Sequence, residues 1–310
     1  MAIITVEAVE SVRFSAPDPA AMRAFLLEFG LVDAATADDG VMRMRGTGDA
    51  PFLHETIAGD PGFVSLALRA ASLSDLQTLA RAEGVEVEPA RGPGGGSIIS
   101  LVDPDGYRVD VVAGRARVSA LPDVEGERWN TIAAQTRPAE PKRFSPRPAR
   151  VVRLGHVVLG VSDTAASWAW WQSRFGLVMS DEVHAPDGTL AAAFIRLDRG
   201  AEPTDHHSLN FAAIPGRPPA FHHVAFEVVD LDDLMLGHEF LKAAGRTHAW
   251  GVGRHILGSQ VFDYWRDPWG HRVEHWTDGD VFAADSPTAV HGLDVMMGQQ
   301  WGPSAPGDFV

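Results

Sequence analysis

An internal repeat constrains the fold of this chain more than any other feature. Residues 103–110 read DPDGYRVD, and residues 267–274 read DPWGHRVE. Proline at the second position and glycine at the fourth are typical of a type I turn, and the alternating residues that follow predict a half-buried strand. The two halves of the chain are therefore expected to share one fold.

Longer segments upstream extend the repeat. Residues 63–84 parallel residues 222–245, and residues 12–32 parallel residues 157–178. Each segment reads as a strand, a helix with a capping residue at its start, and a glycine that ends the helix. The sequence thus predicts an α+β protein of four strand–helix–strand modules that are paired into two domains.

The predicted domain boundaries follow from this repeat and from a change in composition. Residues 1–118 form the N-terminal domain, 119–150 a linker, 151–280 the C-terminal catalytic domain and 281–310 a tail with several glycines and prolines. Within the linker, residues 137–150 hold four prolines and five basic residues, a composition typical of an extended, solvated segment.

Composition excludes several classes of function. The net charge of -15 would repel nucleic acids and anionic membrane surfaces, so we expect neither as a partner. The absence of cysteine excludes disulfides, thiolate metal sites and cysteine nucleophiles. The sequence shows no secretory signal and no apolar stretch of about 20 residues, so we expect a cytoplasmic protein.

Three polar side chains of the C-terminal half occupy module positions suited to metal ligands: His156, His223 and Glu274. Successive side chains of a strand point to opposite faces, so only one of the adjacent residues His222 and His223 is expected to face a site. His222 shares its face with apolar residues, which makes His223 the better ligand. Two histidines and one carboxylate are the ligand set of non-haem Fe(II) oxygenases.

Each of these residues also has a simpler interpretation. A single strand histidine is more often hydrogen-bonded or half-exposed than a ligand, and Glu274 could be an exposed acid or the partner of Arg272. Buried imidazoles and a carboxylate without a cation would suffer a large desolvation cost. The three together therefore favour a metal site.

Residues 253–274, GRHILGSQVFDYWRDPWGHRVE, resemble the signature of type I extradiol (ring-cleavage) dioxygenases of the vicinal oxygen chelate superfamily. His255, Tyr264 and Glu274 take the positions of that signature, whereas Asp263 stands where the family usually has an aliphatic residue. Residues 205–234 resemble the segment that carries the family's acid–base histidine. The resemblance covers nearly the whole chain.

The resemblance implies a fold and a site. Each domain would contain two tandem βαβββ modules, as in glyoxalase-like proteins. His156, His223 and Glu274 would bind Fe(II), or Mn(II) as in some members. His207 would be the catalytic acid–base residue, while His255 and Tyr264 would hydrogen-bond the substrate oxygens.

The activity implied by the resemblance is insertion of both atoms of O2 into a catechol-type substrate, with ring cleavage next to the diol, in the catabolism of aromatic compounds. The partners would be a small aromatic diol and further copies of the chain in a homo-oligomer. Two alternatives stay open, namely another metal-dependent enzyme of the superfamily such as a glyoxalase-like isomerase, and a non-enzymatic small-molecule-binding protein.

The N-terminal half lacks the predicted ligands. The repeat places Ser11, Ser65 and Asp110 opposite His156, His223 and Glu274, so we expect a degenerate, metal-free site there. Several residues stay open between roles in the pocket and in packing or at the surface: Trp250, Trp265, Trp269, Arg246 and Arg254. The tail could cover either the site or a neighbouring subunit.

Overall fold

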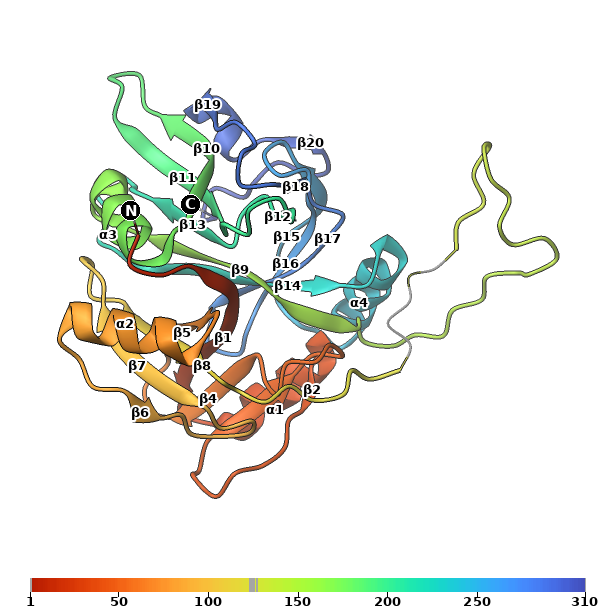
Figure 1. The fold of residues 1–310 in the computed structure, drawn as a ribbon. Helices are drawn as coiled ribbons and strands as arrows, with labels where there is room; N and C mark the ends of the chain where they lie inside the picture. Colours follow the sequence, from red (N-terminus) through yellow and green to blue (C-terminus); the bar gives the residue numbers. More distant parts are fainter. Residues whose placement is uncertain (1, 123–125, 127, 310) are drawn as a thin grey trace.

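Two large β-sheets, one from each half of the chain, form the framework of the structure (Figure 1). It is a computed structural model that describes residues 2–122, 126 and 128–309. No described helix is long and apolar enough to cross a membrane.

The N-terminal half contains two βαβββ modules. Their elements are β1 (Val6–Ala16), α1 (Pro19–Phe29), β2 (Val32–Asp33), β3 (Met42–Arg45), β4 (His54–Ala58), β5 (Gly62–Ala70), α2 (Leu73–Glu83), β6 (Glu88–Pro89), β7 (Ser97–Val102) and β8 (Arg108–Ala113). The strands form one sheet in the order β2-β3-β4-β1-β5-β8-β7-β6. The first strands of the two modules, β1 and β5, therefore pair at its centre.

The C-terminal half repeats this arrangement. Its elements are β9 (Val151–Gly160), α3 (Thr164–Phe175), β10 (Val178–His184), β11 (Leu190–Arg196), β12 (Thr204–Asp205), β13 (Leu209–Ala212), β14 (Phe221–Val228), α4 (Leu231–Ala243), β15 (His248–His255), β16 (Val261–Arg266) and β17 (Arg272–Thr277). The tail adds β18 (Val281–Phe282), β19 (Ala289–Gly292), α5 (Leu293–Met296) and β20 (Gln299–Trp301). The predicted α+β fold of four modules is confirmed.

Local chemistry explains why the modules repeat. The side chains of Asp18, Ser72, Asp163 and Asp230 cap α1 to α4 by accepting hydrogen bonds from the first turn. The repeated turns are also built alike. Asp103 Oδ1 accepts from the backbone N–H groups two and four residues later, at 3.0 and 2.9 Å, and Asp267 Oδ1 does the same at 2.8 and 2.9 Å.

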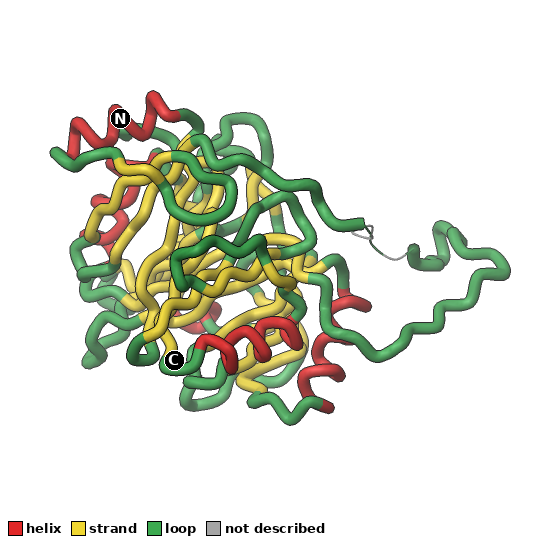
Figure 2. Tube along the Cα trace, turned by 90° about the horizontal axis from the view of Figure 1, so that it is seen from below, coloured by secondary structure: helices red, strands yellow, loops and turns green. Residues whose placement is uncertain are grey.

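In the C-terminal sheet the order of strands is β19-β10-β11-β13-β9-β14-β17-β16-β15-β20. Strands of the tail thus pair at both edges of this sheet, β19 with β10 and β20 with β15. Figure 2 shows the strands gathered in the middle of the molecule with helices around them. Of the segment between β8 and β9, the described residues 128–143 extend away from the body of the molecule (Figure 1).

One hydrophobic core runs through both domains. Phe29 of α1 stacks on His275 of β17, whose Nε2–H can donate to the carbonyl oxygen of Phe29 at 2.6 Å. The Tyr107 hydroxyl donates to the carbonyl oxygen of Gly160 at 2.7 Å. These contacts lock the N-terminal half against the back of the sheet that carries the predicted ligands.

Candidate metal centre and substrate pocket

Three adjacent strands of the C-terminal sheet bring the predicted ligands together. Ala225 on β14 lies opposite His156 of β9 on one side and opposite Glu274 of β17 on the other. His223 precedes Ala225 by two residues and so points to the same face. The small side chain of Ala225 leaves space between its three larger neighbours. Register and alternation therefore produce the cluster from residues far apart in sequence.

The donor atoms of this cluster converge on one point. His156 Nε2 lies 3.1 Å and His223 Nε2 3.3 Å from Glu274 Oε2, and the two nitrogens are 3.3 Å apart. Metal–ligand bonds of about 2.0–2.2 Å put neighbouring ligand atoms roughly 3 Å apart. All three side chains are buried. The geometry fits a single divalent cation with three protein ligands.

Electrostatics at the cluster also fit a cation. Burial raises the pKa of Glu274, and its Oε1 has no hydrogen-bond partner among the described residues. Burial lowers the pKa of His223 well below its usual value, which keeps the imidazole neutral. Neutral imidazole is the form that binds metals. A bound cation would compensate the buried carboxylate charge that the protein leaves partly unpaired.

Close packing fixes the position of His156. A Cβ on the preceding residue, Gly155, would lie 2.3 Å from Nε1 of the Trp276 indole. Only glycine allows this approach, and the indole in turn lies near the imidazole of His156, with ring centroids 6.0 Å apart. Trp276 thus packs near the imidazole of His156 and restricts its position.

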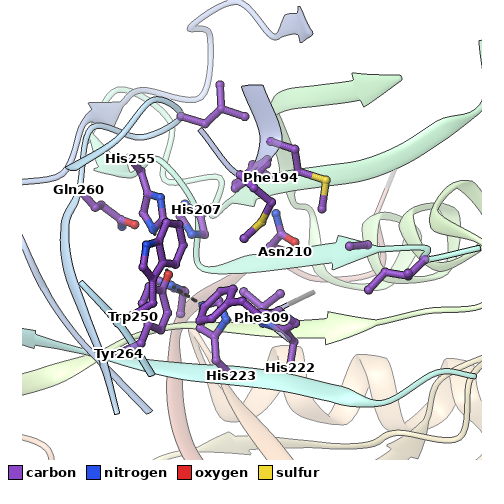
Figure 3. A pocket seen from close by; sticks show the side chains of 17 residues that line it. Phe194, His207, Asn210, His222, His223, Trp250, His255, Gln260, Tyr264 and Phe309 are labelled. Atoms are coloured by element: carbon purple, nitrogen blue, oxygen red, sulfur yellow. Dashed lines mark hydrogen bonds between the residues drawn. The ribbon is translucent and has the colours of Figure 1, made fainter. Parts of the chain in front are cut away.

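A pocket opens on the face of the sheet where the cluster lies, and the three predicted catalytic residues line it (Figure 3). The rings of His207 and His156 have their centroids 4.2 Å apart. His255 Nε2 lies 3.0 Å from the Tyr264 hydroxyl, and Tyr264 sits opposite Glu274 in the strand register. Five of the six predicted residues therefore line one cavity, and the sixth, Glu274, is buried in contact with His156 and His223.

Burial controls the protonation of these groups. It lowers the pKa of His207 well below its usual value and that of His255 to about 3, so both rings are neutral near pH 7. Burial, with the nearby Glu274 carboxylate, raises the pKa of Tyr264 well above its usual value. Tyr264 therefore remains a hydrogen-bond donor, and each of the two neutral imidazoles keeps one ring nitrogen without a proton.

The expectation that only one of the adjacent histidines faces the site is wrong. His222 and His223 both line the pocket, and their Nδ1 atoms are 2.7 Å apart. An irregularity in the pairing of β14 with β9, between Phe221 and His223, breaks the strict alternation at this point. The carbonyl oxygen of Phe309 in the tail lies 3.0 Å from His222 Nε2.

A second contact that the sequence does not reveal lies behind His207. Its Nδ1 is 3.1 Å from His206 Nδ1, and His206 Nε2 is 2.7 Å from Asp181 Oδ2. All three side chains are buried. Because His206 and Asp181 come from different parts of the chain, no local sequence motif predicts the contact between them.

The residues left open also find their places. Trp250 lines the pocket, whereas Trp265 is buried on the other side of β16 and Trp269 packs against the main core. Arg246 pairs with Glu28 at 2.5 Å and Arg254 with Asp278 at 2.7 Å, so neither lines the pocket. The tail does reach the pocket, where it contributes three lining side chains: Met296, Met297 and Phe309.

Comparison with known proteins agrees with this site. The family model of the Glyoxalase/Bleomycin resistance protein/Dioxygenase superfamily matches residues 153–275, the part that supplies all six residues. The matched segment contains β9 to β17 nearly whole, with the strand register that assembles the cluster.

Relatives match over nearly the full length. Metapyrocatechase 2 from Cupriavidus necator is 27% identical over 98% of this chain and 92% of its own. An Mn(II)-bound glyoxalase from Novosphingobium aromaticivorans is 26% identical, with a TM-score of 0.77 over 98% of this chain and 93% of that one. The resemblance to extradiol dioxygenases of this superfamily, predicted from the sequence, is confirmed.

The fold is shared with a solved extradiol enzyme. Homoprotocatechuate 2,3-dioxygenase from Brevibacterium fuscum, in complex with 3,4-dihydroxyphenylacetate, is 18% identical and superposes with a TM-score of 0.78. The match covers 98% of this chain and 91% of that one. Both domains of the present chain therefore take part in the likeness.

Proposed function

We propose that this protein is an extradiol dioxygenase that cleaves the ring of a catechol-type substrate next to its two hydroxyl groups. The observation that carries the proposal is the convergence of His156, His223 and Glu274, two of which line a pocket together with His207, His255 and Tyr264. The full-length relationship to metapyrocatechase 2 supports the same activity.

The metal is Fe(II), with Mn(II) as the alternative, and O2 is the second substrate. His156, His223 and Glu274 would hold the ion. When bound, this redox metal supplies the electron transfer that ground-state dioxygen needs in order to react with an aromatic diol. Zinc could bind the same three ligands, but it is redox-inert and would not support this reaction.

His207 is positioned to take the proton of a substrate hydroxyl. If His206 donates Nε2–H to Asp181, its Nδ1 is an acceptor and receives Nδ1–H from His207. That order of donors leaves Nε2 of His207 free of hydrogen. The neutral ring can then accept a proton from the diol and return it later in the reaction.

His255 and Tyr264 orient the substrate oxygens. Their mutual contact of 3.0 Å holds the two polar groups side by side in an otherwise apolar wall. The hydroxyl of Tyr264 stays protonated and can donate to an anionic substrate oxygen. The pair thus favours the deprotonated diol in a single orientation.

The lining of the pocket indicates a neutral substrate. Its walls away from the cluster are largely apolar: Phe194, Trp250, Leu257, Met296, Met297 and Phe309. No lysine or arginine occurs among the described residues that line it. A substrate carboxylate would find no cationic partner and would lose its hydration. We therefore propose a catechol with a small uncharged, apolar substituent.

One alternative has a specific observation behind it, because the solved relative from Novosphingobium aromaticivorans is described as a glyoxalase. A glyoxalase-like isomerase would use the same metal ligands without a need for the His255–Tyr264 pair. The presence of that pair in the pocket favours the dioxygenase.

Oxygen uptake distinguishes the two activities. Protein reconstituted with Fe(II) without air would be mixed with 3-methylcatechol, with 3,4-dihydroxyphenylacetate, and with a 2-oxoaldehyde–glutathione hemithioacetal, and then exposed to O2. We expect one O2 consumed per catechol, a yellow ring-opened product, and faster turnover of the uncharged catechol. Conversion of the hemithioacetal without oxygen uptake would instead establish the isomerase.

We also propose that the N-terminal domain is metal-free, that the protein acts in the cytoplasm and that it assembles as a homo-oligomer. Metal analysis of the double variant Glu274→Gln, His248→Gln, which removes one ligand from each cluster of the C-terminal half, tests the first of these, and the mass of the protein in solution tests the last.

A further inference from the structure

A second cluster of metal-ligating side chains lies outside the pocket. His238 comes from α4, His248 from β15 and Asp263 from β16. Asp263 and Tyr264 are neighbours on one strand, so their side chains point to opposite faces of the sheet. The cluster therefore lies on the helix-covered face, behind the wall that carries Tyr264. Asp263 is also the residue at which this chain departs from the extradiol signature.

Both imidazoles of this cluster reach the same carboxylate oxygen. His248 Nε2 lies 2.8 Å from Asp263 Oδ1, and His238 Nδ1 lies 3.2 Å from the same oxygen and 3.1 Å from Oδ2. The other oxygen, Oδ2, accepts a hydrogen bond from Nε1 of Trp265 at 2.6 Å. Carboxylates that bind metals are commonly oriented by such a hydrogen bond on the second oxygen.

Two histidines also contact an aspartate elsewhere in the structure, but their nitrogen atoms do not converge on one point. Asp181 also contacts two imidazoles, but His206 Nε2 meets Oδ2 at 2.7 Å and His291 Nε2 meets Oδ1 at 3.1 Å. Those nitrogens lie on different oxygens and share no point. In the described part of the chain, only the two clusters with converging donors bring three ligand atoms within 4.8 Å of one another.

The cluster is partly exposed, so a metal ion could exchange between it and the solvent. Asp263 is completely buried, whereas the side chains of His238 and His248 are 14% and 34% exposed. A cation could enter from the imidazole side, and water could complete its coordination. Two imidazoles and a carboxylate are ligands that Zn(II) binds in four-coordinate sites with bonds of about 2.0–2.2 Å.

We infer that His238, His248 and Asp263 form a second divalent-metal site, which takes Zn(II). The ion would tie helix α4 to the β15–β16 hairpin, from which Tyr264 and His255 project into the pocket. The role is structural, and it does not depend on the proposed dioxygenase activity. No proton or electron transfer is involved beyond displacement of the imidazole protons by the metal.

The test is the zinc content of metal-stripped full-length protein after equilibrium dialysis at mildly alkaline pH against a buffer that fixes free Zn(II). We expect two zinc ions per chain in the wild type, one in Glu274→Gln, one in His248→Gln and none in the double variant. Glutamine at 248 keeps a donor for Asp263, so this variant should fold, which its circular dichroism checks.

Two more variants make the assignment specific. His238→Gln should also lose one ion, whereas His291→Gln, at the other histidine–aspartate contact, should keep both. The melting temperature should rise with zinc in Glu274→Gln but not in the double variant. A wild type that binds a single ion, or a second ion that persists in His238→Gln and His248→Gln, overturns the proposal. Neither result would bear on the dioxygenase activity.

Discussion

Equivalent backbone positions in the two domains carry side chains of different chemical types. In the C-terminal sheet, Ala225 lies between His156 and Glu274, and in the N-terminal sheet Ala67 lies between Ser11 and Asp110. His223 pairs with Arg272 as Ser65 pairs with Arg108. The backbone register is therefore the same, and only the side chains differ.

The carboxylate shows what this difference means. Asp110 accepts hydrogen bonds from Ser65 at 3.0 Å, from Ser100 at 2.6 Å and from Arg108 at 2.9 Å. Among the described residues, no guanidinium group hydrogen-bonds to Glu274, and its Oε1 has no hydrogen-bond partner. In the N-terminal domain a guanidinium group supplies the positive charge, whereas in the C-terminal domain we expect a metal ion to supply it. The scaffold provides the positions, but the residues decide whether they bind metal.

Importing the N-terminal residues into the C-terminal site should have the largest effect. The double variant His156→Ser, His223→Ser replaces both imidazoles by hydroxyls, which are poor ligands for Fe(II). We expect loss of iron and loss of ring cleavage, measured by elemental analysis and oxygen uptake. The matched variant Ser65→Ala should retain both and lose about 1 kcal/mol of stability with its hydrogen bond. Stoichiometric iron in the double variant would contradict the ligand assignment.

The next effect concerns the acid–base residue. His207 precedes the register position Leu209 by two residues, as Phe52 precedes His54 in the N-terminal half. His207→Phe therefore installs the residue found at the equivalent N-terminal position. We expect iron to stay bound and the turnover number to fall by about 10²- to 10⁴-fold, because a positioned acid–base group contributes about that much.

A control distinguishes loss of the proton acceptor from a packing defect. His206→Phe removes the neighbour that fixes the ring of His207 but leaves the acceptor itself. Its turnover should fall less, with a changed pH profile. Equal rates for His207→Phe and the wild type would exclude His207 from catalysis.

A buried histidine of the N-terminal domain, His54, is expected to make the stability of the fold depend on pH. His54 stacks on Phe14, faces Asp267 and His271, and has its pKa lowered by burial to about 4. The ordinary value is higher, so the unfolded chain takes up a proton first as the pH falls. The stability contribution of neutral His54 is complete above about pH 6.5 and is lost between there and pH 4, by about 3 kcal/mol.

His54→Leu installs the residue found at the equivalent C-terminal position. Denaturant unfolding at pH 7 and at pH 4.5 should show a smaller acid destabilisation for the variant than for the wild type. Identical pH dependence of the two proteins would mean that His54 is protonated, or accessible, in the folded state.

Much of this site follows from the sequence because it depends on local rules. The repeated turns, the capped helices and the period of two along each strand are sufficient to place His156, His223 and Glu274 on one face. His255 and Tyr264 follow from the resemblance. These features need only the order of residues within one module.

Other features depend on contacts that cross modules or break the rule. His222 reaches the pocket because the pairing of β14 is irregular, and no residue pattern marks that point. Asp181 and His206 meet across separate segments, as do His238 and Asp263. The tail has no counterpart in the N-terminal half, so the repeat says nothing of where Phe309 lies.

The smallest effect on activity is expected from a substitution in the tail, a segment without a counterpart in the N-terminal half. Phe309 is buried against Trp250 and Tyr264, and it lines the pocket of the C-terminal domain. Phe309→Ala should weaken binding of an alkyl-substituted catechol by about 1.4 kcal/mol, which is about tenfold in KM. The turnover number and iron content should change little, because the ligands and His207 are untouched. A fall in turnover with unchanged KM would instead mean that the tail positions the reacting groups, and Trp301→Ala, at an exposed tail residue outside the pocket lining, serves as the control.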